Sequence, residues 1–204
     1  KDIFKEWQEG MQAGNGWSAV FWCNHDQPRA ISRFGDDVNY PKESAKMLAV
    51  SYLFLKGTPF IYQGQEIGMS NWYPSDPNMY EDVQTRWQYE NVGTKKSPEK
   101  RLQRLWHGSR DSARTPVQWS SDEHAGFSKH EPWFYVNENY KEVNVEQQES
   151  DPDSVLNYYR KAIKLRKELS AIRHGDYKEY NKSSSKVYMY SRCEEKQKVL
   201  ELGG

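Results

Sequence analysis

Short apolar runs alternate with dense polar clusters along the chain, and their order predicts two parallel strands. The residues from Ala19 to Cys23 are uniformly apolar and stop at a polar cluster, Asn24-His25-Asp26-Gln27-Pro28-Arg29. An uninterrupted apolar run with polar boundaries is typical of a strand buried on both faces. A second run, from Thr58 to Tyr62, ends in the cluster Gln63-Gly64-Gln65-Glu66.

The segment between these runs has the pattern of a helix over residues 41–56. Pro41 suits the first turn, Gly57 suits the end, and one face carries Ala45, Leu48, Ala49, Tyr52 and Leu53. Strand, helix and strand in this order predict a βαβ unit with a parallel sheet. In such folds the carboxyl ends of the strands carry the catalytic groups, so both polar clusters point to one cleft.

The stretch from Ile67 to about Asp151 is polar, aromatic and irregular, and so long a connection is normally functional. We expect two helices in it. One covers residues 78–89, and the other runs to about His107 from a start at Ser97 and Pro98. Pro116 should stop any helix that reaches it.

The last quarter of the chain predicts a helix and then strands. The helix starts at Asp151-Pro152-Asp153-Ser154 and buries one face, made of Val155, Leu156, Tyr159, Ala162, Ile163, Arg166 and Leu169. Residues 177–180 and 187–192 predict an antiparallel hairpin, and a third strand begins near Val199. Residues 3–11 also have helical spacing without a clear start, which indicates a piece of something longer.

Charge and composition exclude several classes of partner. Lysine plus arginine and aspartate plus glutamate both number 29, so the net charge is zero and no basic block predicts a nucleic acid or membrane partner. We expect no transmembrane helix and no signal peptide at the first residues. Two cysteines, Cys23 and Cys193, fit a reducing compartment, so we expect a cytoplasmic location.

No cofactor or metal is expected from the sequence. The adjacent acids Asp36 and Asp37 follow Gly35, a pattern more typical of a turn than of a metal site. Aromatic residues make up 14% of the chain, which suits sugar stacking and core packing equally. The loop aromatics Trp72, Tyr73, Tyr80 and Trp133 are therefore left open between these two roles.

Three longer motifs carry a resemblance to a known family. They are Asn24-His25-Asp26-Gln27-Pro28-Arg29, Gly57-Thr58-Pro59-Phe60-Ile61-Tyr62-Gln63-Gly64-Gln65-Glu66-Ile67-Gly68-Met69 and Arg114-Thr115-Pro116-Val117-Gln118-Trp119. They resemble the α-amylase superfamily of glycoside hydrolases, and within it the exo-acting α-glucosidases. That branch includes oligo-1,6-glucosidases, maltases and trehalose-6-phosphate hydrolases.

The resemblance implies an α/β fold that is the carboxyl-terminal part of a (β/α)₈ TIM barrel. Residues 1–171 would form the last two βα units of the catalytic barrel, and residues 172–204 the start of an antiparallel β-sandwich domain. The family's nucleophile and general acid follow the fourth and fifth strands, which this sequence does not contain. We expect the chain alone to be inactive, and to need the rest of its barrel or self-association to cover its open strand edges.

The resemblance also implies roles for five residues. Asp26 corresponds to the family's third catalytic carboxylate and His25 to its partner, both bonded to hydroxyls of the sugar being cleaved. Arg114 corresponds to an arginine that reaches the sugar site, with Glu66 as its expected partner. Arg29 has two open readings: it binds ligand, or it fixes the loop.

The implied function is that of a retaining exo-α-glucosidase acting on oligosaccharides or disaccharides. The alternative is a non-catalytic barrel that serves as a binding or partner subunit, but such relatives tend to lose the His-Asp and Arg positions present here. A transglycosylating isomerase of the same branch is a second enzyme alternative. The preferred linkage is left open, since it is set mainly near the absent nucleophile.

Overall fold

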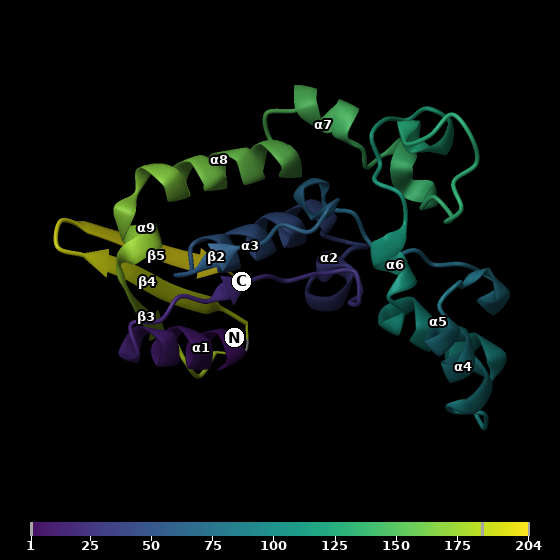
Figure 1. The fold of residues 1–204 in the computed structure, drawn as a ribbon, viewed down its shortest axis with the longest axis horizontal. Coiled ribbons are helices and arrows are strands. Elements are labelled where there is room, and N and C mark those ends of the chain that lie inside the picture. The colour runs from purple at the N-terminus through teal and green to yellow at the C-terminus, as the bar shows by residue number, and fades with distance from the viewer. Residues whose placement is uncertain (1, 185, 204) are drawn as a thin grey trace. The chain divides into compact units, whose positions relative to one another are not determined.

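The computed structural model describes residues 2–184 and 186–203, and the chain forms two compact units (Figure 1). The first unit consists of Lys1–Trp22, Lys46–Ile61 and Tyr158–Gly204, and the second of Cys23–Ala45 and Tyr62–Asn157. The α-helices are α1 (Asp2–Ala13), α2 (Ala30–Phe34), α3 (Pro41–Leu53), α4 (Val83–Asn91), α5 (Pro98–Gly108), α6 (Asp111–Arg114), α7 (Val145–Ser150), α8 (Val155–Glu168) and α9 (Ser170–His174). The 3-10 helices are η1 (Gln65–Ile67), η2 (Pro77–Met79), η3 (Glu123–Gly126) and η4 (Glu138–Lys141). The strands are β1 (Ala19–Val20), β2 (Thr58–Pro59), β3 (Asp176–Tyr180), β4 (Tyr188–Glu194) and β5 (Gln197–Gly203).

The predicted parallel strand pair is present in the first unit. Ala19 lies opposite Thr58 and Val20 opposite Pro59, in parallel register. The backbone N–H of Thr58 donates to the Ser18 carbonyl at 2.8 Å. Helix α3 lies between the two strands in the chain, so the βαβ order is confirmed. Its predicted face is confirmed as well, because all five apolar residues named for it are buried.

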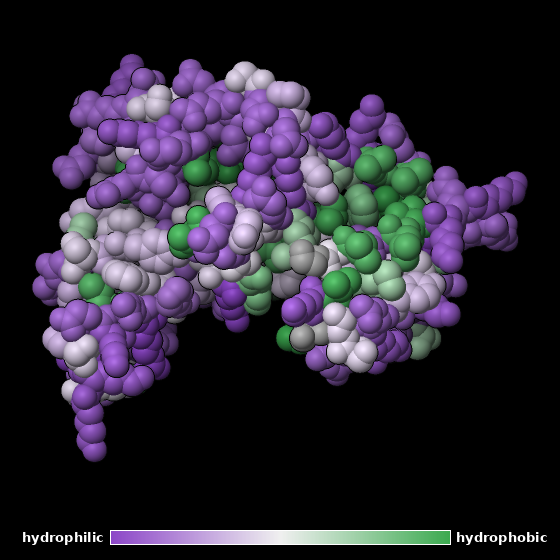
Figure 2. All heavy atoms as spheres, turned by 180° about the vertical axis from the view of Figure 1, so that it is seen from behind, coloured by the Kyte–Doolittle hydropathy of each residue, from purple (hydrophilic) through white to green (hydrophobic). Residues whose placement is uncertain are grey.

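The prediction that the first strand is buried on both faces is wrong. Val20 and Cys23 are buried, whereas Phe21 is 47% exposed, and on the second strand's run Phe60 is 56% exposed. Neighbouring side chains of a strand point to opposite faces, and in the described part of the chain only one face of this small sheet is covered. Figure 2 shows that apolar residues reach the surface seen from behind.

Helix α3 ends at Leu53, three residues before the predicted end, because of contacts with another helix. The guanidinium of Arg166, on α8, donates to the carbonyls of Leu53 at 2.7 Å and Leu55 at 2.8 Å, and also to that of Gly57. These carbonyls therefore have hydrogen-bond donors without a further helical turn. Gly57 has φ +135°, and a Cβ there would lie 2.2 Å from the Ser18 carbonyl oxygen, so this position requires glycine.

The three carboxyl-terminal strands form the predicted antiparallel sheet. The order is β3-β4-β5, with Tyr177 opposite Arg192 and Tyr190 opposite Glu201. Helix α1 contacts β3 in the same unit, where Gln12 Oε1 accepts a hydrogen bond from the Tyr177 N–H at 2.6 Å. The predicted division at residue 171 concerns the domains of the whole protein and stays a prediction.

In the second unit the predicted helix over residues 78–89 is interrupted. A 3-10 turn, η2, ends at Met79, and α4 begins at Val83. The break arises because the buried carboxylate of Asp111 accepts the backbone N–H groups of Glu81 at 2.8 Å and Asp82 at 2.9 Å. These N–H groups therefore cannot belong to a continuous helix. Asp82 then caps α4.

Other predicted boundaries in the chain are confirmed. Ser97 caps α5 and Pro98 opens it, and α6 ends before Pro116. The expected inner face of α8 is buried at Val155, Leu156, Tyr159, Ala162 and Arg166, while Ile163 and Leu169 are half-buried. No helix in the part of the chain that the structure describes is long and apolar enough to cross a membrane.

Candidate active site

The loop after β1 presents His25 and Asp26 on a tight turn in the second unit. The side chain of Asn24 accepts a hydrogen bond from the Asp26 N–H at 2.8 Å, which fixes the turn from within. Beneath it, the buried thiol of Cys23 donates to the Pro28 carbonyl at 3.4 Å, and burial raises the pKa of this thiol. Both site residues remain accessible, with side chains 70% exposed for His25 and 48% exposed for Asp26.

Three side chains gather around the Asp26 carboxylate. Its Oδ1 lies 2.9 Å from Arg114 Nη2 and 3.1 Å from Arg110 Nη1, and its Oδ2 lies 3.3 Å from His25 Nε2. Arg114 also donates from Nε to the His25 carbonyl at 3.1 Å. Within the described residues, both arginines contact Oδ1, whereas Oδ2 has His25 as its charged neighbour.

Arg114 thus reaches the predicted site, but with a different partner. The sequence led us to expect a pair with Glu66, and among the described residues the guanidinium of Arg114 pairs with Asp26 instead. Glu66 lies in η1 and is half-buried. Its Oε2 is buried and accepts no hydrogen bond from the described part of the chain. Its charge acts on Arg29.

Arg29 occupies a different environment, because its side chain is fully enclosed. It is 1% exposed, and its guanidinium donates to the carbonyls of Ser112 at 2.9 Å and Gln63 at 2.5 Å. Thr115 Oγ1 lies 3.4 Å from Nη2. Burial lowers the pKa of Arg29, and the nearby Cys23, Tyr62 and Glu66 oppose this effect. These contacts favour the loop-fixing reading of Arg29 over contact with ligand.

Arg110 belongs to the site and was missed from the sequence. It precedes α6, and Arg114 ends that helix, so the two arginines are four residues apart. Residues at this spacing lie on the same side of a helical turn. The repeat of arginine in Arg110-Asp111-Ser112-Ala113-Arg114 was therefore a usable signal, since Arg114 had already been assigned to the sugar site.

The other candidate residues have structural contacts. The Asp36 carboxylate accepts the backbone N–H groups of Val38 at 3.1 Å and Asn39 at 2.8 Å, as expected of a turn. Trp72 and Tyr80 are buried together with Leu105 in an apolar cluster. Trp133, by contrast, is 82% exposed, and its role stays open.

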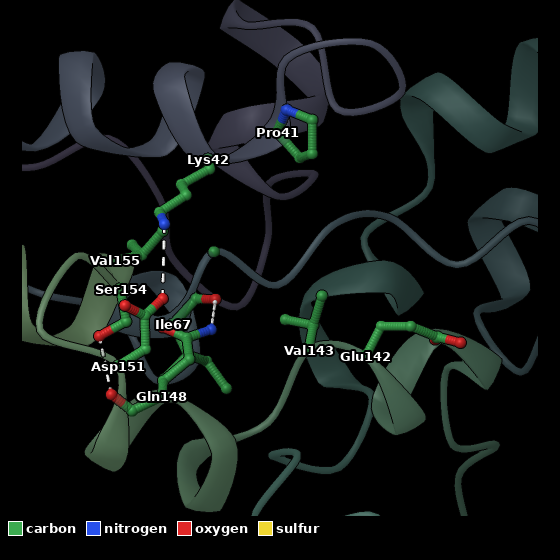
Figure 3. Close-up of a pocket in the computed structure, with 10 residues that line it drawn as sticks. Pro41, Lys42, Ile67, Glu142, Val143, Gln148, Asp151, Ser154 and Val155 are labelled. Atoms are coloured by element: carbon green, nitrogen blue, oxygen red, sulfur yellow. Dashed lines mark hydrogen bonds and ion pairs between the residues drawn. The ribbon is translucent and has the colours of Figure 1, made fainter.

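A cavity of about 200 Å³ in the second unit lies among α3, η1 and α8 (Figure 3). Several of its polar side chains pair with protein groups. Lys42 Nζ lies 2.8 Å from Asp153 and 3.4 Å from Asp151. Gln148 donates to the Ile67 carbonyl at 2.8 Å, as Figure 3 shows. None of the residues around Asp26 lines this cavity. Because these lining groups bind one another across the cavity, we interpret it as a structural junction between elements and not as the candidate active site.

Comparison with known proteins identifies the family to which the chain belongs. The family described as "Alpha amylase, catalytic domain" matches residues 1–175, so the chain belongs to the alpha-amylase family. It is 44% identical to the probable oligo-1,6-glucosidase 2 of Bacillus subtilis and 42% identical to the trehalose-6-phosphate hydrolase of the same organism. These matches cover 99% and 98% of the chain but only 36% of each relative.

Solved structures give the same result. The crystal structure of Bacillus licheniformis trehalose-6-phosphate hydrolase matches with a TM-score of 0.95 and 45% identity. That of an isomaltulose synthase from Klebsiella sp. LX3 matches with a TM-score of 0.91 and 40% identity. Each match covers 98% of this chain and 36% of the other. The chain therefore spans about a third of the length of its relatives, and the predicted family is confirmed.

Proposed function

We propose that the chain is the carboxyl-terminal part of a retaining exo-α-glucosidase that removes terminal α-linked glucose from short oligosaccharides or disaccharides. The observation that carries this proposal is the Asp26 carboxylate, held by Arg110 and Arg114 beside His25 on an accessible turn that follows β1. The similarity to oligo-1,6-glucosidases and a trehalose-6-phosphate hydrolase supports it.

Asp26 would act on the transition state without forming a covalent bond. Retaining glycosidases pass through an oxocarbenium-like state, in which hydrogen bonds to the 2-hydroxyl strengthen. A carboxylate makes charge-assisted hydrogen bonds, so Asp26 Oδ2, next to His25 Nε2, is suited to accept from a sugar hydroxyl. Bonds that tighten as the ring flattens favour the transition state over bound substrate, which raises kcat.

Arg114 and Glu66 would complete this part of the sugar site. Arg114 binds both the His25 carbonyl and the Asp26 carboxylate, so it can hold the turn while it meets the sugar. Glu66 is half-buried and its Oε2 is enclosed, so a hydroxyl of the ligand would be bound through the other carboxylate oxygen. We assign Arg29 to fixing the loop, because its side chain is buried and its guanidinium donates to the carbonyls of Ser112 and Gln63.

In the whole protein, residues 1–171 would be the last two βα units of the (β/α)₈ barrel, and residues 172–204 the start of the β-sandwich. The nucleophile and the general acid would lie in the remaining length that the relatives have. We expect the chain alone to be inactive and to need the rest of the barrel, or self-association, to cover Phe21 and Phe60. We expect a cytoplasmic enzyme with no nucleic acid or membrane partner.

A transglycosylating isomerase is the second candidate, and a specific observation favours it. Isomaltulose synthases match 98% of the chain with TM-scores of 0.90 and 0.91, close to the hydrolase match. A non-catalytic subunit is disfavoured, because His25, Asp26 and Arg114 are all present and form one cluster. Product analysis on sucrose separates the two enzymes, since a hydrolase releases glucose and an isomerase releases a rearranged disaccharide.

The test is to assay the full-length protein on isomaltose, maltose and trehalose 6-phosphate, and to repeat it with Asp26→Asn. We expect release of glucose from at least one substrate and a loss of about 10²–10³-fold in kcat for the variant. Asp122→Asn, in an exposed loop, is the matched control and should keep wild-type turnover. Near wild-type turnover of Asp26→Asn would contradict the role of Asp26, and inactivity on all three substrates would contradict the proposed function.

A further inference from the structure

Arg110 connects the candidate catalytic carboxylate to a second, buried carboxylate. Its Nη1 lies 3.1 Å from Asp26 Oδ1, while its Nε and Nη2 donate to Asp82 Oδ1 at 2.9 and 2.7 Å. One planar guanidinium therefore spans the two acids with three donors. A lysine ammonium is a point charge on a flexible stem and lacks this fork.

The two ends of this bridge differ in burial. The Asp26 side chain is 48% exposed and that of Asp82 only 4%. An exposed ion pair contributes little to stability, so the contact with Asp26 would be weak by itself. The contact with Asp82 is shielded from water and made by two donors, so it decides where the guanidinium lies.

Asp82 makes further hydrogen bonds besides those with Arg110. Its Oδ2 accepts from the Thr85 N–H at 2.9 Å and from Thr85 Oγ1 at 2.7 Å at the start of α4. Burial raises the pKa of Asp82, but the hydrogen bonds from Arg110 and Thr85 outweigh this and hold the pKa below its usual value. Asp111, next to Arg110 in the chain, binds the backbone N–H of Asp82. The anchor is thus fixed through both its side chain and its backbone.

We propose that Arg110 is a positioning residue for Asp26, and that Asp82 is the anchor that fixes Arg110. The segment that begins α4 thereby sets the orientation of a carboxylate on a different loop, 84 residues away from Arg110 in the chain. Together with Arg114, Arg110 fixes Oδ1 and so sets where Oδ2 points. The inference rests on the proposed function, in which Asp26 binds the sugar.

Four single variants of the full-length protein and one double variant test this, with p-nitrophenyl α-D-glucopyranoside as substrate. Arg110→Lys keeps a charge beside Asp82 but cannot span both acids. Arg110→Gln removes the charge, and Asp82→Asn keeps a residue that caps helices well while weakening the hold on Arg110. Arg104→Gln, exposed on α5, is the matched control.

We expect Arg110→Lys and Arg110→Gln both to lose about 10²-fold in kcat, since small misplacements of a catalytic group cost this much. KM should change far less. Asp82→Asn should lower kcat as well, and the double variant with Arg110→Gln should be no slower than Arg110→Gln alone, because both act through one contact. Arg104→Gln should match wild type.

Three outcomes would overturn the inference. One is wild-type kcat in Arg110→Lys, which would mean that Arg110 serves only as a charge that stabilises the fold. Another is strict additivity of Arg110→Gln and Asp82→Asn, which would mean that Asp82 acts independently. If the wild-type protein hydrolyses no α-glucoside, the proposed function fails and this inference with it. If Asp26→Asn is slow but Arg110→Lys is not, only the inference about Arg110 fails.

Discussion

Two clusters of side chains in the second unit, one around Arg29 and one around Asp26, use arginine differently, and they differ in burial and in hydrogen-bond partner. The first, around Arg29, is sealed from water, and its donors end on backbone carbonyls. The second, around Asp26, is accessible, and its arginines Arg110 and Arg114 end on a carboxylate. One residue type thus serves two purposes in one compact unit.

The difference shows how to distinguish arginines that stabilise the fold from arginines that contribute to turnover. A guanidinium that is enclosed among protein oxygens cannot be reached by a ligand, and removing it leaves several buried acceptors unpaired. An accessible guanidinium on a carboxylate can exchange its contacts with those of a sugar. Variants of the first cluster should therefore reduce stability, and variants of the second should reduce turnover.

The largest effect is expected for Arg29→Met. It removes three hydrogen bonds in a buried network, so the free energy of unfolding should fall by about 3–5 kcal/mol. Thermal and denaturant unfolding of the full-length protein measure this. Arg33→Met, exposed on α2, the helix that directly follows Arg29, is the control and should change little. An Arg29→Met protein with wild-type stability and lower activity would reverse the assignment of the two clusters.

A buried carboxyl in the first unit, that of Glu201, is expected to make stability depend on pH. Burial raises the pKa of Glu201 from 4.5 to about 7. Between these two pH values the folded state keeps a proton that the unfolded state releases. The contribution of Glu201 to the free energy of unfolding is therefore complete below pH 4.5 and is lost as pH rises through 7. Glu201→Gln should remove a pH-dependent change on the order of 3 kcal/mol between these limits.

The measurement is the unfolding free energy of the full-length protein from pH 4.5 to 8. Glu194→Gln, exposed on the neighbouring strand β4, is the control. The same pH slope in wild type and Glu201→Gln would show that this carboxyl does not titrate as its burial implies.

Next in size is Arg114→Gln. We expect kcat/KM to fall about 10²-fold, equal to about 2.7 kcal/mol of transition-state stabilisation, because Asp26 loses a partner and, under the proposed function, the sugar does too. Stability should change by less than about 1 kcal/mol, since the ion pair is partly exposed. Steady-state kinetics and melting of the same sample test both statements. A large loss of stability with normal turnover of the folded fraction would place Arg114 with Arg29.

The smallest effect is expected for Glu81→Gln. Its carboxylate pairs with Arg86 at 3.2 Å, and both side chains are 46% exposed. Such a pair contributes about 0.2–1 kcal/mol, and turnover should not change. The variant also controls for Asp82→Asn at the adjacent position. A loss of turnover in Glu81→Gln would indicate that the start of α4 tolerates no change. A loss in Asp82→Asn would then no longer show that Asp82 anchors Arg110.

Features set by neighbours in the chain were predictable. Ser97 and Pro98 start a helix because the cap bonds to a backbone group three residues on. The inner face of α8 follows from its periodicity. The break before α4 was not predictable, because the carboxylate that takes the two backbone N–H groups belongs to Asp111, about thirty residues later.

The sequence by itself determined the order of strand, helix and strand, the family, and the placement of His25 and Asp26 on a turn after β1. These depend on periodicity, capping and motifs that act over a few residues. Only the tertiary structure decided that Arg114 pairs with Asp26, that Arg110 joins it, and that Arg29 is sealed. An ion pair between residues 84 or 88 positions apart is set by how separate elements pack, and no local pattern specifies that distance.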